Sequence, residues 1–132
     1  EELNKLLKRY SENYGRRFSS LMASSWDLWL DGYSAGIPHR KVSIYVQGAL
    51  VAMALDGLIR QQTKGSKSLD DAMRALWERF GQSQKGYTHT DVVGIIAELA
   101  GITTHAFFHA YVEGTTDLLP VLANTAAYAG LE

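Results

Sequence analysis

The 132-residue sequence predicts an all-α domain of about six or seven helices. Three observations lead to this fold class. Apolar residues recur at helical spacing along most of the chain, residues that favour helix N-termini precede these segments, and glycines follow them. No segment alternates apolar and polar residues as a half-buried strand does. A chain of this length can bury roughly two-thirds of its unfolded surface, so we expect residues 1–132 to form a single helical domain without disulfides or structural metal.

The composition is typical of a soluble globular protein. Hydrophobic residues make up 46% of the chain, charged residues 20%, and the formal net charge is -1. This balance lacks the basic excess of nucleic-acid-binding proteins. The absence of cysteine excludes disulfides, thiolate nucleophiles and cysteine zinc ligands, and it leaves the cellular compartment open.

Two helices are expected in the first part of the chain. Residues 1–14 are amphipathic, and Gly15 should end that helix. Ser24 or Ser25 can cap a short second helix over residues 26–30. The apolar stripe of the first helix consists of Leu3, Leu6, Leu7 and Tyr10.

A loop and a long core helix should follow. Gly32 opens a loop that contains a second glycine and a proline and leads into a helix over about residues 41–61. The apolar part of this helix approaches membrane-spanning length, but Ser43, Gln47 and Asp56 interrupt it, so we expect a buried helix and no membrane span. Small residues should let neighbouring helices approach closely: Gly48, Ala49, Ala52, Ala54 and Gly57.

The second half repeats a pattern of capped helices. Ser68 should cap a helix that Gly81 closes, with Asp70 and Asp71 in its positive first turn rather than in a catalytic site. Thr88 should cap a helix that ends at Gly101.

Two further helices should complete the chain. Thr103 or Thr104 should cap the helix that begins at His105, and Gly114 should stop it. The tail, residues 116–131, should be helical around Pro120, because proline is tolerated in a first helical turn.

The stretch THAFFHAYVE, residues 104–113, places His105 and His109 on one helical face with Glu113 beyond them. This is the histidine spacing of the zinc motif HExxH, but Ala106 stands where the motif has its catalytic glutamate, so hydrolysis by this stretch is implausible. Three ligands at this spacing would also span about 12 Å of helix, against zinc–ligand bonds of about 2 Å. We therefore expect two partly exposed histidines beside the packing residues Phe107, Phe108 and Tyr111, with metal binding completed by another element as a minor possibility.

Other catalytic signatures are weak or absent. His89 lies within a helix cap and His39 follows a proline, and both positions are typical of surface residues. The sequence contains no phosphate-binding GxGxxG or GxxxxGKS loop and no GxSxG nucleophile motif.

Tyr45 is the strongest candidate site residue. It precedes Gln47 and Gly48 near the start of the long helix, after a loop that could border a cleft. A phenol in that position could donate a hydrogen bond to a developing oxyanion. From chemistry alone, however, a tyrosine near a helix start is usually a packing residue.

The same stretch carries a family resemblance. Residues 42–56, VSIYVQGALVAMALD, resemble the YxKGALVALxLD helix of the glycyl aminopeptidases, zinc metallopeptidases of the gluzincin type that commonly also carry a PDZ domain. Residues 67–80, KSLDDAMRALWERF, resemble the GKSLDDVMRxLWxxF segment of this family. Further similar segments follow the family order over about residues 20–131: SSWDLW at 24–29, GYT at 86–88 with Asp91, AG at 100–101, FF at 107–108, YVEGT at 111–115, LP at 119–120 and AGL at 129–131.

The resemblance implies a role and a context. In this family HExxH and the downstream glutamate ligand precede the segments found here, so the chain resembles the C-terminal helical subdomain of a thermolysin-like gluzincin peptidase, a piece of a longer enzyme. Tyr45 matches the tyrosine of YxKG, which in related gluzincin aminopeptidases stabilises the oxyanion, whereas the lysine of that motif is Gln47 here. The full-length parent would bind zinc and a peptide substrate, and the remainder of its catalytic domain would contact this chain. We expect no zinc in this chain and no peptidase activity from it alone.

A different function class stays open. The chain could be a non-catalytic helical protein-interaction module whose exposed aromatic residues, including Trp26, Trp29 and Tyr33, contact a protein partner. Peptide specificity, compartment and oligomeric state cannot be predicted from the sequence.

Overall fold

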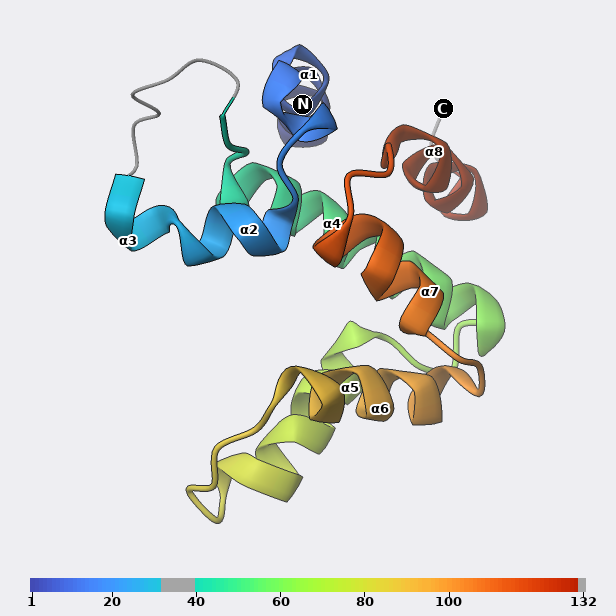
Figure 1. Cartoon of the computed structure of the whole chain (residues 1–132). Coiled ribbons are helices and arrows are strands. Elements are labelled where there is room, and N and C mark those ends of the chain that lie inside the picture. The colour runs from blue at the N-terminus through green and yellow to red at the C-terminus, as the bar shows by residue number, and fades with distance from the viewer. Residues whose placement is uncertain (32–39, 131–132) are drawn as a thin grey trace.

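The computed structural model describes residues 1–31 and 40–130, and every regular element within these residues is a helix (Figure 1). The all-α class predicted from the sequence is confirmed. Within the same residues, none of the helices combines the length and the apolar character needed to cross a membrane.

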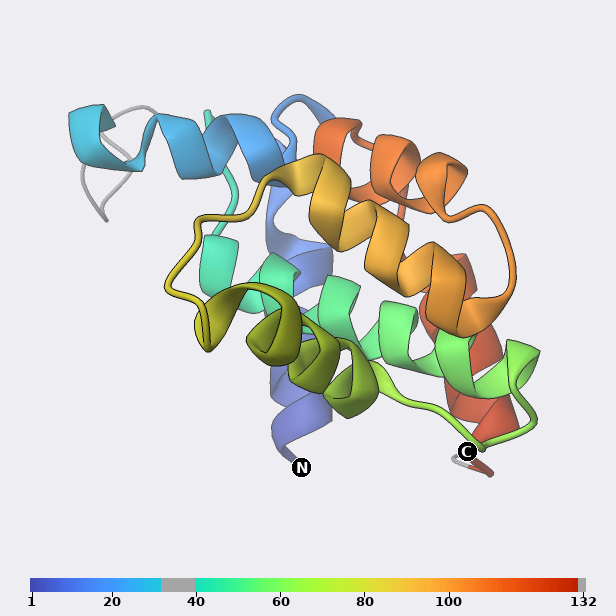
Figure 2. The same ribbon diagram turned by 90° about the horizontal axis from the view of Figure 1, so that it is seen from below.

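Helix α4, Ile44–Gln62, is the centre of the fold, and α1, α2, α5, α6 and α8 all pack against it. In Figure 2, α5 lies in front of α4, and α1 and α8 cross behind it. Because neighbours cover α4 on several sides, its sequence is apolar around most of its circumference. Its buried apolar residues are Val46, Leu50, Val51, Ala54, Leu55 and Ile59.

The chain begins with α1, Glu2–Glu12, followed by a 3₁₀ turn, Tyr14–Arg17. The predicted end at Gly15 is therefore wrong: α1 ends at Asn13, whose backbone is extended. The side chain of Asn13 stabilises the turn that follows α1, because its Oδ1 atom accepts a hydrogen bond from the Gly15 N–H at 2.9 Å.

The predicted second helix is two short helices, α2, Leu21–Trp26, and α3, Leu28–Asp31. The N-cap of α2 is Ser20, whose hydroxyl accepts from the Ala23 N–H at 3.0 Å, so the predicted caps Ser24 and Ser25 are wrong. Both residues lie inside α2. The helix α2 packs against α4, whereas α3 lies at the far end of α2, away from the rest of the fold in both ribbon views (Figures 1 and 2).

The long helix starts later than predicted, after Ser43 as N-cap rather than near Lys41. Of the small residues expected to allow close approach, Gly57 does so: a Cβ added there would lie within 3.0 Å of the Thr125 side chain in α8, Leu119–Tyr128. A Cβ added at Gly48 would meet no atom within 4 Å.

The predicted caps of the next two helices are confirmed. Ser68 and Thr88 begin α5, Leu69–Leu76, and α6, His89–Ala100, each in a capping box. A π-helical turn, Trp77–Gly81, continues α5 to the predicted glycine. Asp56 joins α5 to the core, since its carboxylate accepts the Leu69 N–H at 2.7 Å.

The helix expected at His105 is a single α-helical turn, α7, His105–Phe108, followed by a π-helical turn, His109–Glu113, and it ends at Gly114 as predicted. Thr104 occupies the N-cap position, but its hydroxyl donates to the Val93 carbonyl at 3.1 Å instead of capping α7. Pro120 lies in the first turn of α8, as predicted.

Candidate functional site

Tyr45 is the second residue of α4, and 65% of it is exposed. It lines a hollow of about 180 Å³, the Tyr45 pocket, together with Asn13, Leu28, Lys41, Val42, Ser43 and Ile44. This pocket lies at the N-terminal end of a long helix, where backbone N–H groups and the helix dipole favour negative charge. An accessible phenol at such a position is able to act on a bound molecule.

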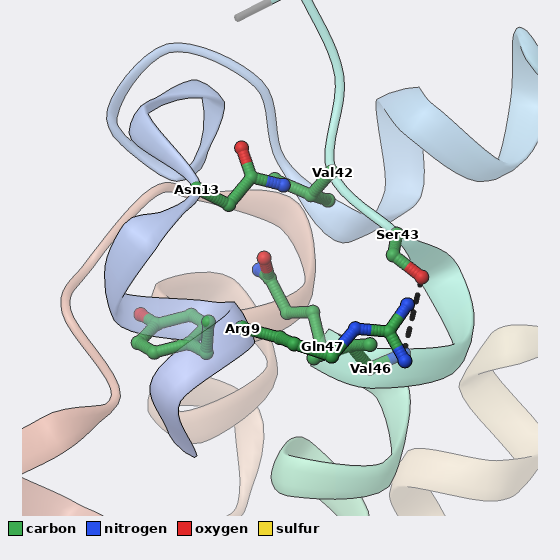
Figure 3. A pocket seen from close by; sticks show the side chains of 7 residues that line it. Arg9, Asn13, Val42, Ser43, Val46 and Gln47 are labelled. Carbon is green, nitrogen blue, oxygen red and sulfur yellow. Dashed lines mark hydrogen bonds between the residues drawn. The ribbon is translucent and has the colours of Figure 1, made fainter. Parts of the chain in front are cut away.

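Contacts from α2 fix the chain where it enters α4. The hydroxyl of Ser24, a residue that is 1% exposed, accepts the Val42 N–H at 3.0 Å and lies 2.9 Å from the Ser19 hydroxyl. Ser43 then accepts the Val46 N–H at 3.3 Å, the dashed line in Figure 3. Tyr45 therefore projects from a backbone that is anchored on both sides.

A second hollow, the Gln47 pocket, lies between α1 and the start of α4 (Figure 3). Its volume is about 120 Å³, and it shares Asn13, Val42 and Ser43 with the Tyr45 pocket. The amide of Gln47 points into it; Gln47 is 5% exposed, and its Oε1 atom has no hydrogen-bond partner. The other lining residues are Arg9, Tyr10 and Val46.

Aromatic residues are exposed on the helices next to the Tyr45 pocket. Trp26 is 78% exposed and Trp29 93%, and Leu30 beside them is 85% exposed. Tyr33, the third aromatic residue proposed for partner contact, lies outside the described residues. Apolar groups of this size are normally covered, so α2 and α3 form a surface suited to another protein segment.

The histidines that the structure describes, His89, His105 and His109, do not assemble a metal centre. His105 and His109 are exposed, and Glu113 contacts His89 rather than either of them, with 3.3 Å between His89 Nε2 and Glu113 Oε1. Within residues 1–31 and 40–130, no three histidine, aspartate or glutamate side chains are grouped closely enough to hold a metal ion. The residues within these ranges thus do not fit zinc, which takes three or four protein ligands. His39 lies outside the described residues.

Two aspartates with lowered pKa values, Asp71 and Asp91, cap the N-termini of α5 and α6. Asp71 accepts the Ser68 N–H at 2.9 Å, and this backbone hydrogen bond is the main cause of its lowered pKa. Asp91 accepts both the hydroxyl and the N–H of Thr88, which lower its pKa in the same way. Hydrogen bonds that stabilise the ionised form make these carboxyls poor proton donors and acceptors near neutral pH. A catalytic role has no support in this geometry.

Comparison with known proteins points to one family. Residues 1–51 match the family model described as M61 glycyl aminopeptidase. The resemblance to the glycyl aminopeptidases is confirmed. The matched segment contains Tyr45 and also residues 1–19, which the motif comparison did not use, while the similar segments after residue 51 lie outside the match. No curated protein and no solved structure matches the chain significantly.

The match supports a peptidase-related role for the chain and associates it with a metallopeptidase family. The sequence suggested Tyr45 as a candidate site residue, but it did not suggest the neighbouring Gln47 pocket. One signal was available for Gln47, because it is a polar residue on the same helical face as Leu50, Val51 and Ala54. No sequence signal connects Arg9 or Asn13 with Gln47, because they come from another part of the chain.

Proposed function

We propose that this chain is the C-terminal helical subdomain of a zinc-dependent aminopeptidase of the gluzincin type, that it lines the active-site cleft, and that Tyr45 stabilises the oxyanion. The observation that carries this proposal is the position of Tyr45: it lies inside the segment that matches the M61 glycyl aminopeptidases, and it is an exposed residue that lines a pocket. A buried tyrosine at the same place could not reach a substrate.

The surroundings of Tyr45 suit a negatively charged oxygen. The first turn of α4 presents the positive end of the helix dipole, and the cationic residue Lys41 lines the same pocket. The Tyr45 hydroxyl would donate a hydrogen bond to the carbonyl oxygen of the scissile peptide as that oxygen gains charge. A donor used in this way contributes a factor of about 10² to 10³ to kcat.

Zinc and the general base belong, in this proposal, to the remainder of the catalytic domain. The described residues offer no cluster that could bind the metal, so Tyr45 is the catalytic contribution that we assign to this chain. The partner of the exposed α2 and α3 surface would be that remaining part of the enzyme. The isolated chain is then expected to be inactive, and zinc-dependent peptide hydrolysis by the purified chain would contradict the proposal.

The test is the peptidase rate of the full-length parent, comparing wild type with Tyr45→Phe at equal zinc content. We expect kcat to fall about a hundredfold with KM nearly unchanged, because only a hydrogen bond to the transition state is lost. Tyr128→Phe is the matched control, since Tyr128 is a 50% exposed tyrosine at the end of α8 and does not line the Tyr45 pocket. An unchanged kcat in Tyr45→Phe would remove the assignment.

A non-catalytic interaction module is the second candidate, favoured by the exposure of Trp26 and Trp29. The reading frame of the parent gene distinguishes these two functions. An HExxH motif upstream in the same reading frame supports the peptidase, whereas a native start near Glu1 supports the module.

A further inference from the structure

The Gln47 pocket contains a polar group that the protein itself leaves unsatisfied. Gln47 Oε1 is buried without a hydrogen-bond partner in a residue that is 5% exposed. Burying an amide oxygen in this way is costly, and native proteins normally pair such groups with protein, water or ligand. The amide points into the pocket (Figure 3), and its other polar atom, Nε2, is not among the buried unpaired atoms, so a bound molecule is able to reach Nε2.

The pocket is rich in hydrogen-bond donors. Asn13 Oδ1 already accepts the Gly15 N–H, which leaves the Asn13 NH₂ group for another acceptor. The Ser43 oxygen accepts the Val46 N–H, which leaves its hydroxyl proton. Arg9 adds a guanidinium, which has donors and no acceptor. A ligand that offers several acceptor oxygens would complement this set.

The Gln47 amide adds a further donor. Its Nε2 atom makes no hydrogen bond within the described residues and is not among their buried unpaired atoms, so it lies on the accessible side of the amide. Nε2 can therefore donate to a ligand in the pocket.

The charged groups around the pocket favour a negatively charged ligand. Arg9 is the one charged residue among the described residues that line the pocket, and no carboxylate lines it. Arg9 is exposed at the pocket and has no ion-pair partner among the described residues. The pocket also lies at the N-terminal end of α4, a helix of 19 residues, where the dipole favours an anion. A cationic amine would meet repulsion from both.

We propose that the Gln47 pocket binds a carboxylate group of a peptide, held by the Arg9 guanidinium and the Gln47 and Asn13 amides. The peptide part of this proposal rests on the proposed peptidase function. The Gln47 pocket shares Asn13, Val42 and Ser43 with the Tyr45 pocket, so a peptide whose carbonyl lies at Tyr45 would place a nearby carboxylate there. The enzyme would then prefer substrates with an acidic side chain or a free C-terminus close to the cleaved bond.

Binding can be measured on this chain by NMR, with the Gln47 side-chain NH₂ resonances as the reporter. The probes are acetate, the tripeptide Gly-Ala-Ala with a free C-terminus, Gly-Glu-amide with only a side-chain carboxylate, and Gly-Ala-amide with no carboxylate. We expect saturable shifts of the Gln47 signals with carboxylate probes and none with Gly-Ala-amide. A response to Gly-Ala-Ala alone assigns the site to a C-terminus, and a response to Gly-Glu-amide alone assigns it to an acidic side chain. Absence of saturation with every carboxylate probe, or equal shifts with Gly-Ala-amide, overturns the proposal.

Three variants locate the binding. Arg9→Gln and Gln47→Met should each weaken carboxylate binding about tenfold, because each removes a donor that contacts the ligand. For Gln47→Met the reporter is the backbone amide of Val46. Lys8→Gln is the matched control: Lys8 is the adjacent cation on α1, lies 3.9 Å from Glu12 and does not line the pocket, so affinity should be unchanged. Arg9 is exposed, so Arg9→Gln keeps the test valid even if Gln47→Met disturbs the fold. Full affinity in Arg9→Gln contradicts the proposed site.

The NMR titration requires neither zinc nor catalysis, so it separates this proposal from the proposed function. Carboxylate binding together with an unchanged kcat in Tyr45→Phe would refute the catalytic role and leave the anion site. A hundredfold lower kcat in Tyr45→Phe without any carboxylate binding would refute the pocket alone.

Discussion

A single phenolic oxygen in α1 should contribute measurably to the stability of the fold. Tyr10 is 3% exposed, and its hydroxyl accepts the Leu118 N–H at 2.9 Å and donates to Asp117 Oδ1 at 3.2 Å. These contacts join the first helix to the segment that begins α8, across most of the sequence. Tyr10→Phe deletes the hydroxyl and keeps the ring, including its contact with the Arg16 guanidinium 5.0 Å from the ring centroid.

The expected cost comes mainly from Leu118. This residue is fully buried, so its N–H has no access to water once the Tyr10 oxygen is removed. A buried donor left unsatisfied costs about 1 to 3 kcal/mol. The bond to the more exposed Asp117 adds little, since water can replace it. We therefore expect Tyr10→Phe to lower the free energy of unfolding by about 2 kcal/mol, which for a chain of this size lowers Tm by about 8 °C.

Urea and thermal unfolding followed by circular dichroism would measure this loss. Tyr128→Phe is the matched control, because the Tyr128 hydroxyl donates to the Arg60 carbonyl at 3.2 Å from an exposed position where water can substitute. Its effect should stay within about 0.5 kcal/mol. If the two variants lose equal stability, or if Tyr10→Phe loses none, the inference that Tyr10 holds α1 to α8 is refuted.

Further predictions concern helix packing and acid stability. Gly57→Ala should lower the free energy of unfolding in urea by about 1 to 2 kcal/mol, because the new methyl group overlaps Thr125. Gly48→Ala on the same helix should raise it by about 0.5 to 1 kcal/mol, since the added group meets open space. Equal effects of the two substitutions would contradict the close approach of α4 and α8. Hydrogen bonds lower the pKa of Asp71 and Asp91 below the ordinary 3.8, so their contribution to stability is complete above that pH and is lost as the pH falls through the lowered values. Unfolding at a series of acidic pH values should show a shallower loss in the Asp71→Asn/Asp91→Asn double variant than in wild type, and identical slopes would show that these caps do not contribute.

The sequence determined the features that depend on residues close together in the chain. The caps at Ser68 and Thr88 were predictable, because each capping box joins residues three positions apart. The all-α class followed from helical periodicity, and the family resemblance at Tyr45 followed from a contiguous motif whose first part, residues 42–51, lies within the family match.

The predicted helix caps were wrong where the hydroxyl group forms its hydrogen bond with another element of the fold. Ser24 has the chemistry of an N-cap, but its hydroxyl binds the Val42 N–H, 18 residues away, and Ser20 caps α2 instead. Thr104 similarly bonds to Val93 of α6 rather than to its own helix. Side chains of this kind bind whichever backbone group lies within reach, and periodicity does not show which group that is.

Only the tertiary structure decided what surrounds the candidate site. It placed Arg9 and Asn13 beside Gln47, and it paired His89 with Glu113 where the sequence suggested a common face for Glu113 and the two later histidines. The sequence alone predicted that Tyr45 lies near the start of a long apolar helix. Whether that tyrosine is exposed, and which groups face it, depended on the packing of α1, α2 and α4, because contacts between distant segments are set by how the helices pack together.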